Sequence, residues 1–128
     1  MSLSLSLVLL PQTLVVVRLA PTAQIPTTWN QTGDFWSIVR TPEEISLVCD
    51  EFAVPPGMIV EKGWRVFKVN GPLSFDMVGV IASLSLPLAN AGVSIFSIST
   101  YDTDYLMVKE EKVNLAIETW QQAGYKVI

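Results

Sequence analysis

Histidine is absent from this chain of 128 residues, and cysteine occurs only once. These absences exclude disulfide bonds within the chain, zinc sites built from histidine and cysteine, and catalytic triads that contain histidine. The single Cys49 lies in an apolar stretch that we predict to be helical, and we expect its thiol to pack in the core. A catalytic cysteine would lack the histidine that usually activates it.

Basic residues are also scarce, and they form no cluster. Lysine and arginine total 8 against 12 acidic residues, which gives a net charge of −4. Binding to a phosphate backbone requires concentrated positive charge, so we expect no nucleic-acid partner. Only 16% of the residues are charged and 50% are hydrophobic. This composition predicts a folded core, in one compact unit or two very small ones.

Long apolar runs are missing too, although the chain starts with MSLSLSLVLL. That segment has no basic residue and no small-residue cleavage site, so it lacks the marks of a signal peptide. Serine and leucine alternate in it with the period of a strand, and Pro11 ends the run before it reaches the length of a membrane span. We therefore expect a cytoplasmic protein with no membrane partner, in which the Asn30-Gln31-Thr32 sequon is not glycosylated.

The first half is predicted to contain strands, an irregular stretch and one helix. Strands are expected at residues 3–10, 13–19 and 35–40, and an irregular stretch at residues 20–34. A helix is expected to start at Thr41, because Pro42 and Glu44 follow it at positions typical of a helix N-terminus. The apolar face of this helix would consist of Ile45, Val48 and Phe52, and the prolines at positions 55 and 56 would end it.

The second half is predicted to alternate strands and helices. Strands are expected at residues 58–60, 64–69, 93–100, 104–108 and 125–128, and helices at residues 73–90 and 110–123. The inward faces of these helices would be Val80, Ile81, Leu84 and Leu88, then Val113, Ala116, Ile117 and Trp120. Pro87 should lie in the last turn of the first helix or kink it. From residue 64 on, the order βαββαβ predicts an α+β, ferredoxin-like layer with two helices on one face of an antiparallel sheet.

A weak internal repeat is also present. Residues 36–40 followed by the expected helix are similar to residues 105–109 followed by a helix, at an offset of 69. Leu47 and Val48 would then correspond to Ala116 and Ile117. We predict a degenerate first unit at residues 1–63 and a complete second unit at residues 64–128. The alternative is that any two strand–helix segments look alike.

Charge is distributed unevenly in the second unit. Between Val69 and Val108 there is no lysine or arginine, and the charged residues are Asp76, Asp102 and Asp104. One interpretation is structural: Asp76 caps a helix, and the other two form a turn. The other is functional: acids without basic neighbours accept an ammonium or guanidinium group, while open backbone amides near residues 76–79 hold a carboxylate. Such a site would bind a zwitterion such as an amino acid.

Other chemistry is poorly supported. No base is present to activate the serines and threonines of residues 94–100. Asp102 and Asp104 share one turn, so they cannot flank a substrate as glycosidase carboxylates do, and they lack the other oxygens of a cation cage. We therefore predict no enzyme, no metal and no cofactor. The tryptophans are expected in the core or an interface: Trp29, Trp36, Trp64 and Trp120.

Several segments resemble a known family: GPLSFD (71–76), GVIASL (79–84), PLANAGVSIF (87–96) and ISTYDTDYLMV (98–108). They are similar to the ACT domain, and in particular to the subfamily shared by the CASTOR arginine sensors and short bacterial proteins with two ACT-like units. The run 98–108 is the most specific. The resemblance is strong over about residues 60–128, and residues 35–51 match the degenerate first unit of those proteins more loosely.

The resemblance implies a regulatory module that binds an amino acid without catalysis, with the ligand between ACT units. The ligand-binding positions it implies are Ser74, Phe75, Asp76, Met77, Thr100, Tyr101 and Asp104. Asp104 matches the acid that holds the basic end of arginine. Met77 stands where the sensors have glutamate, and Ser74 stands where they have glycine. These differences weaken the case for arginine in particular and leave a different amino acid, or no ligand, as alternatives.

Our hypothesis from the sequence is a cytoplasmic ligand-sensing protein. The sensors are twice as long, so the resemblance also implies a homodimer that supplies the same set of units. The alternative, from another functional class, is a structural or protein-interaction module in which the ACT sheet mediates association and the pocket is vestigial. A closed contact between residues 73–77 and 100–104, with no cavity, would favour this alternative.

Overall fold

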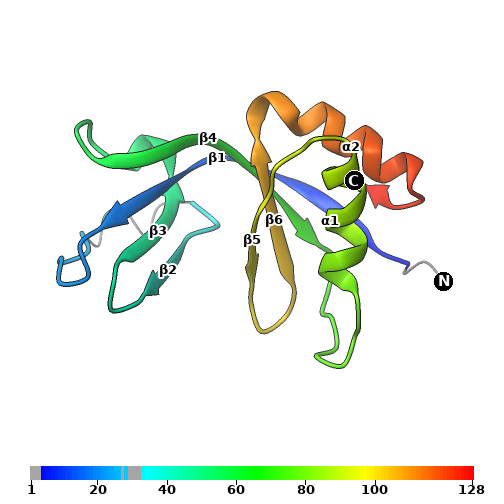
Figure 1. Ribbon diagram of the computed structural model, residues 1–128, viewed down its shortest axis with the longest axis horizontal. Helices are drawn as coiled ribbons and strands as arrows, with labels where there is room; N and C mark the ends of the chain where they lie inside the picture. The colour runs from blue at the N-terminus through cyan, green and yellow to red at the C-terminus, as the bar shows by residue number, and fades with distance from the viewer. Residues whose placement is uncertain (1–3, 27, 29–32) are drawn as a thin grey trace. The chain divides into compact units, whose positions relative to one another are not determined.

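The computed structural model describes residues 4–26, 28 and 33–128, and the chain divides into two compact units (Figure 1). The main unit comprises Met1–Pro11 and Arg65–Ile128, and the inserted unit comprises Gln12–Trp64. This grouping differs from the predicted units 1–63 and 64–128, because the stretch up to Pro11 belongs with the C-terminal half. Trp29 and the sequon Asn30-Gln31-Thr32 lie outside the described residues.

The main unit contains the predicted βαββαβ order. Its elements are the end of β4 (Ile59–Val69), α1 (Val80–Asn90), β5 (Phe96–Ser99), β6 (Asp104–Lys109), a 3-10 turn η2 (Glu110–Lys112), α2 (Val113–Gln122) and β7 (Lys126–Val127). The start of β1 (Ser6–Leu19) adds a strand between β4 and β7. Strand β7 runs parallel to β1, whereas β5 and β6 form an antiparallel hairpin. The ferredoxin-like layer is therefore confirmed, and it includes one strand that the sequence analysis had assigned to the first unit.

Hydrogen bonds fix the start of β1 beside the end of β4. The Asn70 backbone N–H donates to the Ser6 carbonyl at 2.9 Å. The Arg65 guanidinium donates to the Leu10 carbonyl at 3.0 Å. Residue numbers rise along β1 from Ser6 to Leu10, while those of the partners in and after β4 fall from Asn70 to Arg65. The two segments therefore run in opposite directions.

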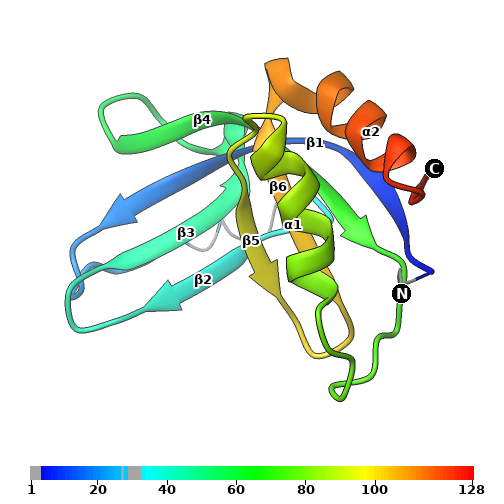
Figure 2. The same ribbon diagram turned by 45° about the vertical axis from the view of Figure 1, so that its right-hand side comes forward.

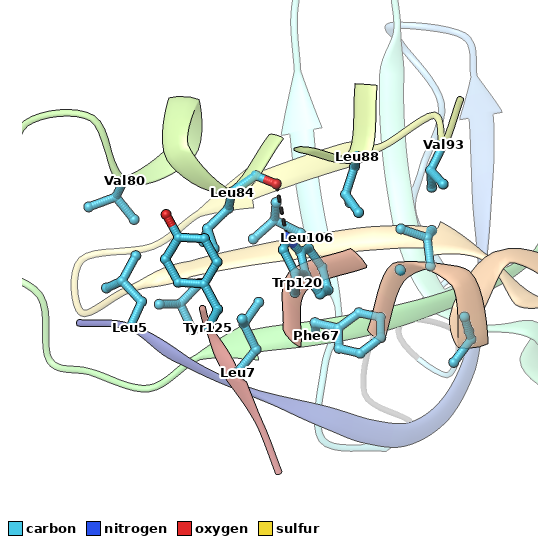
Figure 3. Close-up of a cluster of buried hydrophobic side chains, with 14 residues drawn as sticks. Leu5, Leu7, Phe67, Val80, Leu84, Leu88, Val93, Leu106, Trp120 and Tyr125 are labelled. Atoms are coloured by element: carbon cyan, nitrogen blue, oxygen red, sulfur yellow. Dashed lines mark hydrogen bonds between the residues drawn. The ribbon is translucent and has the colours of Figure 1, made fainter. Parts of the chain in front are cut away.

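The core of the main unit lies between this sheet and the two helices (Figures 2 and 3). Both helices contribute to one cluster, so they cover the same face. Six of the eight predicted inward residues are buried, namely Val80, Leu84, Leu88, Val113, Ala116 and Trp120, whereas Ile81 and Ile117 are half-buried. The Trp120 indole packs edge-on against Phe67, with ring centroids 4.8 Å apart, and its Nε1 donates to the Leu84 carbonyl at 2.9 Å. This bond satisfies a buried donor and links α2 to α1.

Helix α1 is shorter than predicted. It begins at Val80 rather than Leu73, after Gly79 in the left-handed conformation (φ 87°). Residues 71–79 therefore form an irregular loop. Pro87 lies in the last turn, as predicted, and the helix ends at Asn90 before Gly92 (φ 78°).

The inserted unit is built from strands and lacks the predicted helix. It contains the end of β1, β2 (Ser37–Arg40), β3 (Ile45–Asp50), the 3-10 turn η1 (Glu51–Ala53) and the start of β4. Strand β3 pairs antiparallel with β1 on one side and with β2 on the other. No α-helix occurs among the residues that the structure describes in this unit.

The predicted helix start at Thr41 is wrong, although the capping chemistry is present. The Thr41 hydroxyl accepts the backbone N–H groups of Glu43 and Glu44, each at 3.2 Å. However, the Thr41 N–H donates back to the Glu44 carbonyl at 2.9 Å, which closes a turn between β2 and β3. Ile45 and Val48 then belong to a strand with a partner on each side. The correspondence of Leu47 and Val48 with two residues of α2 is therefore wrong as well, because one segment is a strand and the other a helix.

The described tryptophans and Cys49 differ in their exposure to solvent. Trp64 and Trp120 are buried as predicted, but Trp36 is 44% exposed and does not belong to the core. Cys49 is fully buried as predicted, in a strand rather than a helix. It packs in the core of the inserted unit with Val15 and Leu47, among others. Among the described residues, no helix has the length and apolar character needed to cross a membrane.

Candidate functional site

A pocket of about 450 Å³ opens on the main unit, between the loop before α1, the first turn of α1 and the turn that joins β5 to β6. The two loop segments that the sequence singled out therefore face one cavity. Most of the predicted ligand-binding residues line it: Ser74, Phe75, Met77, Thr100, Tyr101 and Asp104. Asp76 does not line it.

Backbone contacts hold the two walls of the pocket together. The Leu73 N–H donates to the Asp102 carbonyl at 2.7 Å, which ties the loop before α1 to the β5–β6 turn. The hydroxyl of Thr103, a side chain only 3% exposed, donates to the carbonyl of Val69 at 2.6 Å. A Cβ on Gly71 would lie 3.1 Å from both the Asp102 carbonyl oxygen and Thr103 Cβ. Only glycine permits this close approach without a shift of the neighbouring backbone.

Asp104 is the acid best prepared to hold a cation. It is half-buried at the start of β6, opposite Ser99 in the hairpin register. The Ser99 hydroxyl donates to its Oδ1 at 2.6 Å, which orients the carboxylate. A carboxylate accepts several hydrogen bonds, so this contact leaves capacity for ammonium or guanidinium N–H groups.

The first turn of α1 supplies the opposite electrostatic character. Gly79, Val80, Ile81 and Ala82 line the pocket. The N-cap Gly79 has no side chain to cap the helix, and the first turn contains no acid. The first amide to bond within this helix is that of Ser83, which donates to the Gly79 carbonyl at 2.8 Å. The N–H groups of residues 80–82 are thus open at the helix start, and they attract anions together with the helix dipole. Within the predicted segment 76–79, the Asp76 and Met77 N–H groups are already bonded to Ser74.

The other two acids have different positions. Asp76 is exposed in a turn in which its N–H donates to the Ser74 hydroxyl at 3.2 Å. It does not cap α1, because the helix starts four residues later. Asp102 lines the pocket although it was not among the predicted site residues. It also lines a neighbouring hollow together with Lys68, a basic side chain that can offset its charge.

Two aromatic rings lie across the rim of the pocket. Phe75 comes from the loop before α1, and Tyr101 from the β5–β6 turn. Their centroids are 4.9 Å apart and their planes stand at 90°, an edge-to-face contact between the two walls. The side chains are 74% and 81% exposed, so the contact faces solvent.

Several lining residues were not among the predicted ligand-binding positions, although Asp102 had been considered as an acid for a cation and Gly79 as part of the amide segment. They are Leu73, Gly79, Val80, Ile81, Ala82, Ser99, Asp102 and Thr103. Gly79 could have marked the start of α1, because glycine readily adopts the left-handed conformation of this N-cap. The predicted helix was instead extended back to Leu73. Thr103 carried no sequence signal, because its role depends on the carbonyl of a distant strand.

Cys49 does not line this pocket. Burial, and then the charge of Asp50, raises the pKa of the Cys49 thiol to about 11, so it is a poor nucleophile at neutral pH. Among the described residues, no group of three or more histidine, cysteine, aspartate and glutamate side chains is placed to hold a metal ion. The pocket itself offers the carboxylates of Asp102 and Asp104 and the open amides at the start of α1.

Two models of known families match separate parts of the chain. A family model described as ACT domain matches residues 59–121, and a second model, described as an N-terminal domain, matches residues 13–56. The cytosolic arginine sensor for mTORC1 subunit 1 of Rattus norvegicus is 37% identical over 95 residues, which cover 66% of this chain and 29% of the sensor. The same sensor of Bos taurus is 31% identical over 96 residues. The match thus spans less than a third of these curated relatives.

Solved structures extend the likeness to the whole chain. A protein from Agobacterium tumefaciens is 33% identical, with a TM-score of 0.92 over 99% of this chain and 94% of that one. The regulatory subunit of aspartate kinase from Thermus thermophilus is 14% identical, with a TM-score of 0.56 over 88% of this chain and 93% of that one. At that identity the second likeness concerns the fold alone.

Proposed function

Because this chain belongs to the CASTOR-like subfamily of ACT-domain proteins, we propose that it is a non-enzymatic regulatory protein that binds an amino acid in the pocket beside α1. The observation that carries this proposal is the pairing of opposite charges around one cavity. Asp104 offers a carboxylate at one wall, and the open amides of residues 80–82 offer positive partial charge at another. A free amino acid carries the complementary ammonium and carboxylate groups.

The size of the pocket suits such a ligand. Small-molecule sites are typically clefts of about 300–1,000 Å³, and this one measures about 450 Å³. Its lining also contains uncharged surface from Leu73, Phe75, Met77 and Tyr101. We propose that the α-ammonium group bonds to Asp104 and the α-carboxylate to the start of α1, while the amino-acid side chain contacts these uncharged groups.

The proposal also covers the cellular location of the protein, its oligomeric state and its partners. The relatives include cytosolic arginine sensors, which supports a cytoplasmic location. The pocket is open on one side, and we propose that a second ACT unit completes it in a homodimer. We propose no cofactor and no nucleic-acid or membrane partner.

A second candidate function is a protein-interaction module with a vestigial pocket. The exposed apolar side chains of Phe75, Val78 and Tyr101, at 74%, 88% and 81%, favour it, because such groups often mark contact surfaces. The open cavity between the two loops favours ligand binding instead.

A thermal-shift screen with each of the twenty amino acids at millimolar concentration tests the proposal. A ligand at 100 times its dissociation constant adds about 2.7 kcal/mol to the free energy of unfolding, which raises the melting temperature by several degrees. We expect at least one amino acid to do so. If none does, the ligand-binding function is wrong and the interaction module is favoured.

The variant Asp104→Asn tests the site itself. We expect it to lose the ligand-induced shift, because an amide cannot replace the charge that holds the ammonium group. Asp76→Asn is the matched control: it removes the same charge from an exposed turn outside the pocket, and the shift should persist. An unchanged shift in Asp104→Asn would show that the ligand binds elsewhere.

A further inference from the structure

The inserted unit presents an aromatic side chain that is almost fully exposed. Phe52, in η1, is 90% exposed, the highest value among the large hydrophobic side chains that the structure describes. Its backbone is fixed, because the Asp50 carboxylate accepts the Phe52 N–H at 2.9 Å. This Asx-type bond caps the short turn and presents the ring to solvent.

A hollow of matching size is lined by residues on both sides of Phe52 in the chain, Glu51 and Val54. It measures about 140 Å³. Its apolar lining comes from the core and its margin: Val15, Val54, Met58 and Val60. An apolar cavity of about 150 Å³ accommodates a benzene ring, so this hollow is close to the size that a phenylalanine ring requires.

Charges of both signs border the same hollow. Glu51, which precedes Phe52 in the chain, lines it together with Lys62. A second copy that inserted its own Phe52 would bring its Glu51 to the rim, where Lys62 of the first copy attracts it. One small surface therefore carries an apolar knob, a hole of its size, an acid and a base.

We propose that Phe52 of one chain inserts into this hollow of a second copy, and reciprocally, so that two inserted units form an isologous dimer. A two-fold axis closes such a contact, because each copy supplies both halves of it. The partner is a second copy of this chain because both complementary features, in shape and in charge, belong to one surface. The pocket of the main unit takes no part, so this contact differs from the one proposed to complete that pocket, and the inference stands apart from amino-acid binding.

The dimer is expected to be weak. Burying one aromatic side chain removes roughly 150–250 Å² from water. Two reciprocal insertions, with the charged and proline-bearing rims around them, fall at the small end of specific interfaces, below about 1,200 Å². Association should therefore depend on protein concentration.

Sedimentation velocity over a range of concentrations tests the contact with the full chain. We expect a reversible dimer, with a dissociation constant that rises roughly tenfold or more in Phe52→Ser, because a central aromatic anchor is lost. Leu86→Ser, in α1 of the main unit, removes another exposed apolar side chain, at 62% exposure, and should leave the constant unchanged. A chain that stays monomeric at millimolar concentration, or a Phe52→Ser variant that dimerises like the wild type, would overturn the proposal.

Charge reversal gives a signature that contacts within one chain cannot produce. Glu51→Lys and Lys62→Glu should each associate less than the wild type, because like charges then face each other across the two-fold axis. An equimolar mixture of the two variants should associate more than either alone, since every reversed charge meets an opposite one. If the mixture associates no more strongly than either variant alone, the proposal is wrong. All these variants should keep any amino-acid-induced thermal shift, which separates a failed dimer from a failed ligand site.

Discussion

The three aspartates of the second half show how the surroundings of a residue decide its part. Asp104 has a serine hydroxyl on one oxygen and a half-buried position at the pocket. Asp102 gives its backbone carbonyl to the opposite loop. Asp76 lies in an exposed turn. Equal side chains therefore differ in what they can bind, and Asp104 alone combines an oriented carboxylate with a place in the lining.

Cys49 allows a prediction about pH. Burial raises the pKa of its thiol from 9.0 to about 11, so above pH 9 the unfolded chain releases a proton that the folded chain retains. The stability from this group is complete below pH 9 and declines as pH rises toward 11. We expect the free energy of unfolding of the wild type to fall by on the order of 2 kcal/mol relative to Cys49→Val across that window. Urea titrations at several pH values measure it, and parallel curves for both proteins would contradict it.

The sequence was informative about which residues carry charge and which enter the core, but less so about distances between segments. The acid-only stretch and the family resemblance led to the two segments that now line one pocket. The acid-only stretch did not distinguish Asp76 from Asp102, and the resemblance selected Asp76, although Asp102 is the one that lines the pocket. That distinction depends on a hydrogen bond between Leu73 and Asp102 and on where α1 begins, and both are tertiary properties.

Among the elements, β3 is the one that the sequence misplaced. The Thr41-Pro42-Glu43-Glu44 run has the residues of a helix N-terminus, and it does form the hydrogen bonds of a cap. The following segment, however, contains β-branched and apolar residues that find strands on both sides. Pairing with β1 and β2 outweighs a helix propensity of a few tenths of a kcal/mol per residue. In the main unit, by contrast, the existence of both helices was predicted, because each buries an apolar face against the sheet, although α1 begins seven residues later than predicted.

Substitutions of the N-cap residue Gly79 test whether the start of α1 requires a left-handed backbone. Its φ of 87° is strained for a side chain, although a Cβ there would meet nothing closer than the Ser83 hydroxyl at 3.9 Å. Gly79→Ala should therefore lower the free energy of unfolding by about 1–2 kcal/mol through backbone strain rather than a clash. Gly79→Asn should cost less, because asparagine tolerates this conformation. Urea denaturation compares them, and equal losses in both variants would argue against strain as the cause.

On the scale of the whole molecule, chain order and spatial order differ. The unit boundaries fall within β1 and β4, so the first strand of the chain completes the sheet formed by its last half. Leu5 and Leu7, at 7% and 0% exposure, belong to the core of the main unit. The sequence offered only the alternating pattern of this strand, which fixes its faces but not its neighbours.

A fragment with residues 65–128 alone should therefore fail to unfold cooperatively, because β7 would lose the partner that it pairs with at Ser6 and Leu7. Replacing Gln12–Trp64 by a short glycine-containing turn should restore folding, since Leu10 and Arg65 are joined by a 3.0 Å hydrogen bond. Circular dichroism during urea titration measures both. In the shortened chain, Leu7→Ser should abolish the transition by removing a core side chain. If residues 65–128 alone unfold cooperatively and are as stable as the shortened chain, the start of β1 is not needed for the stability of the main unit.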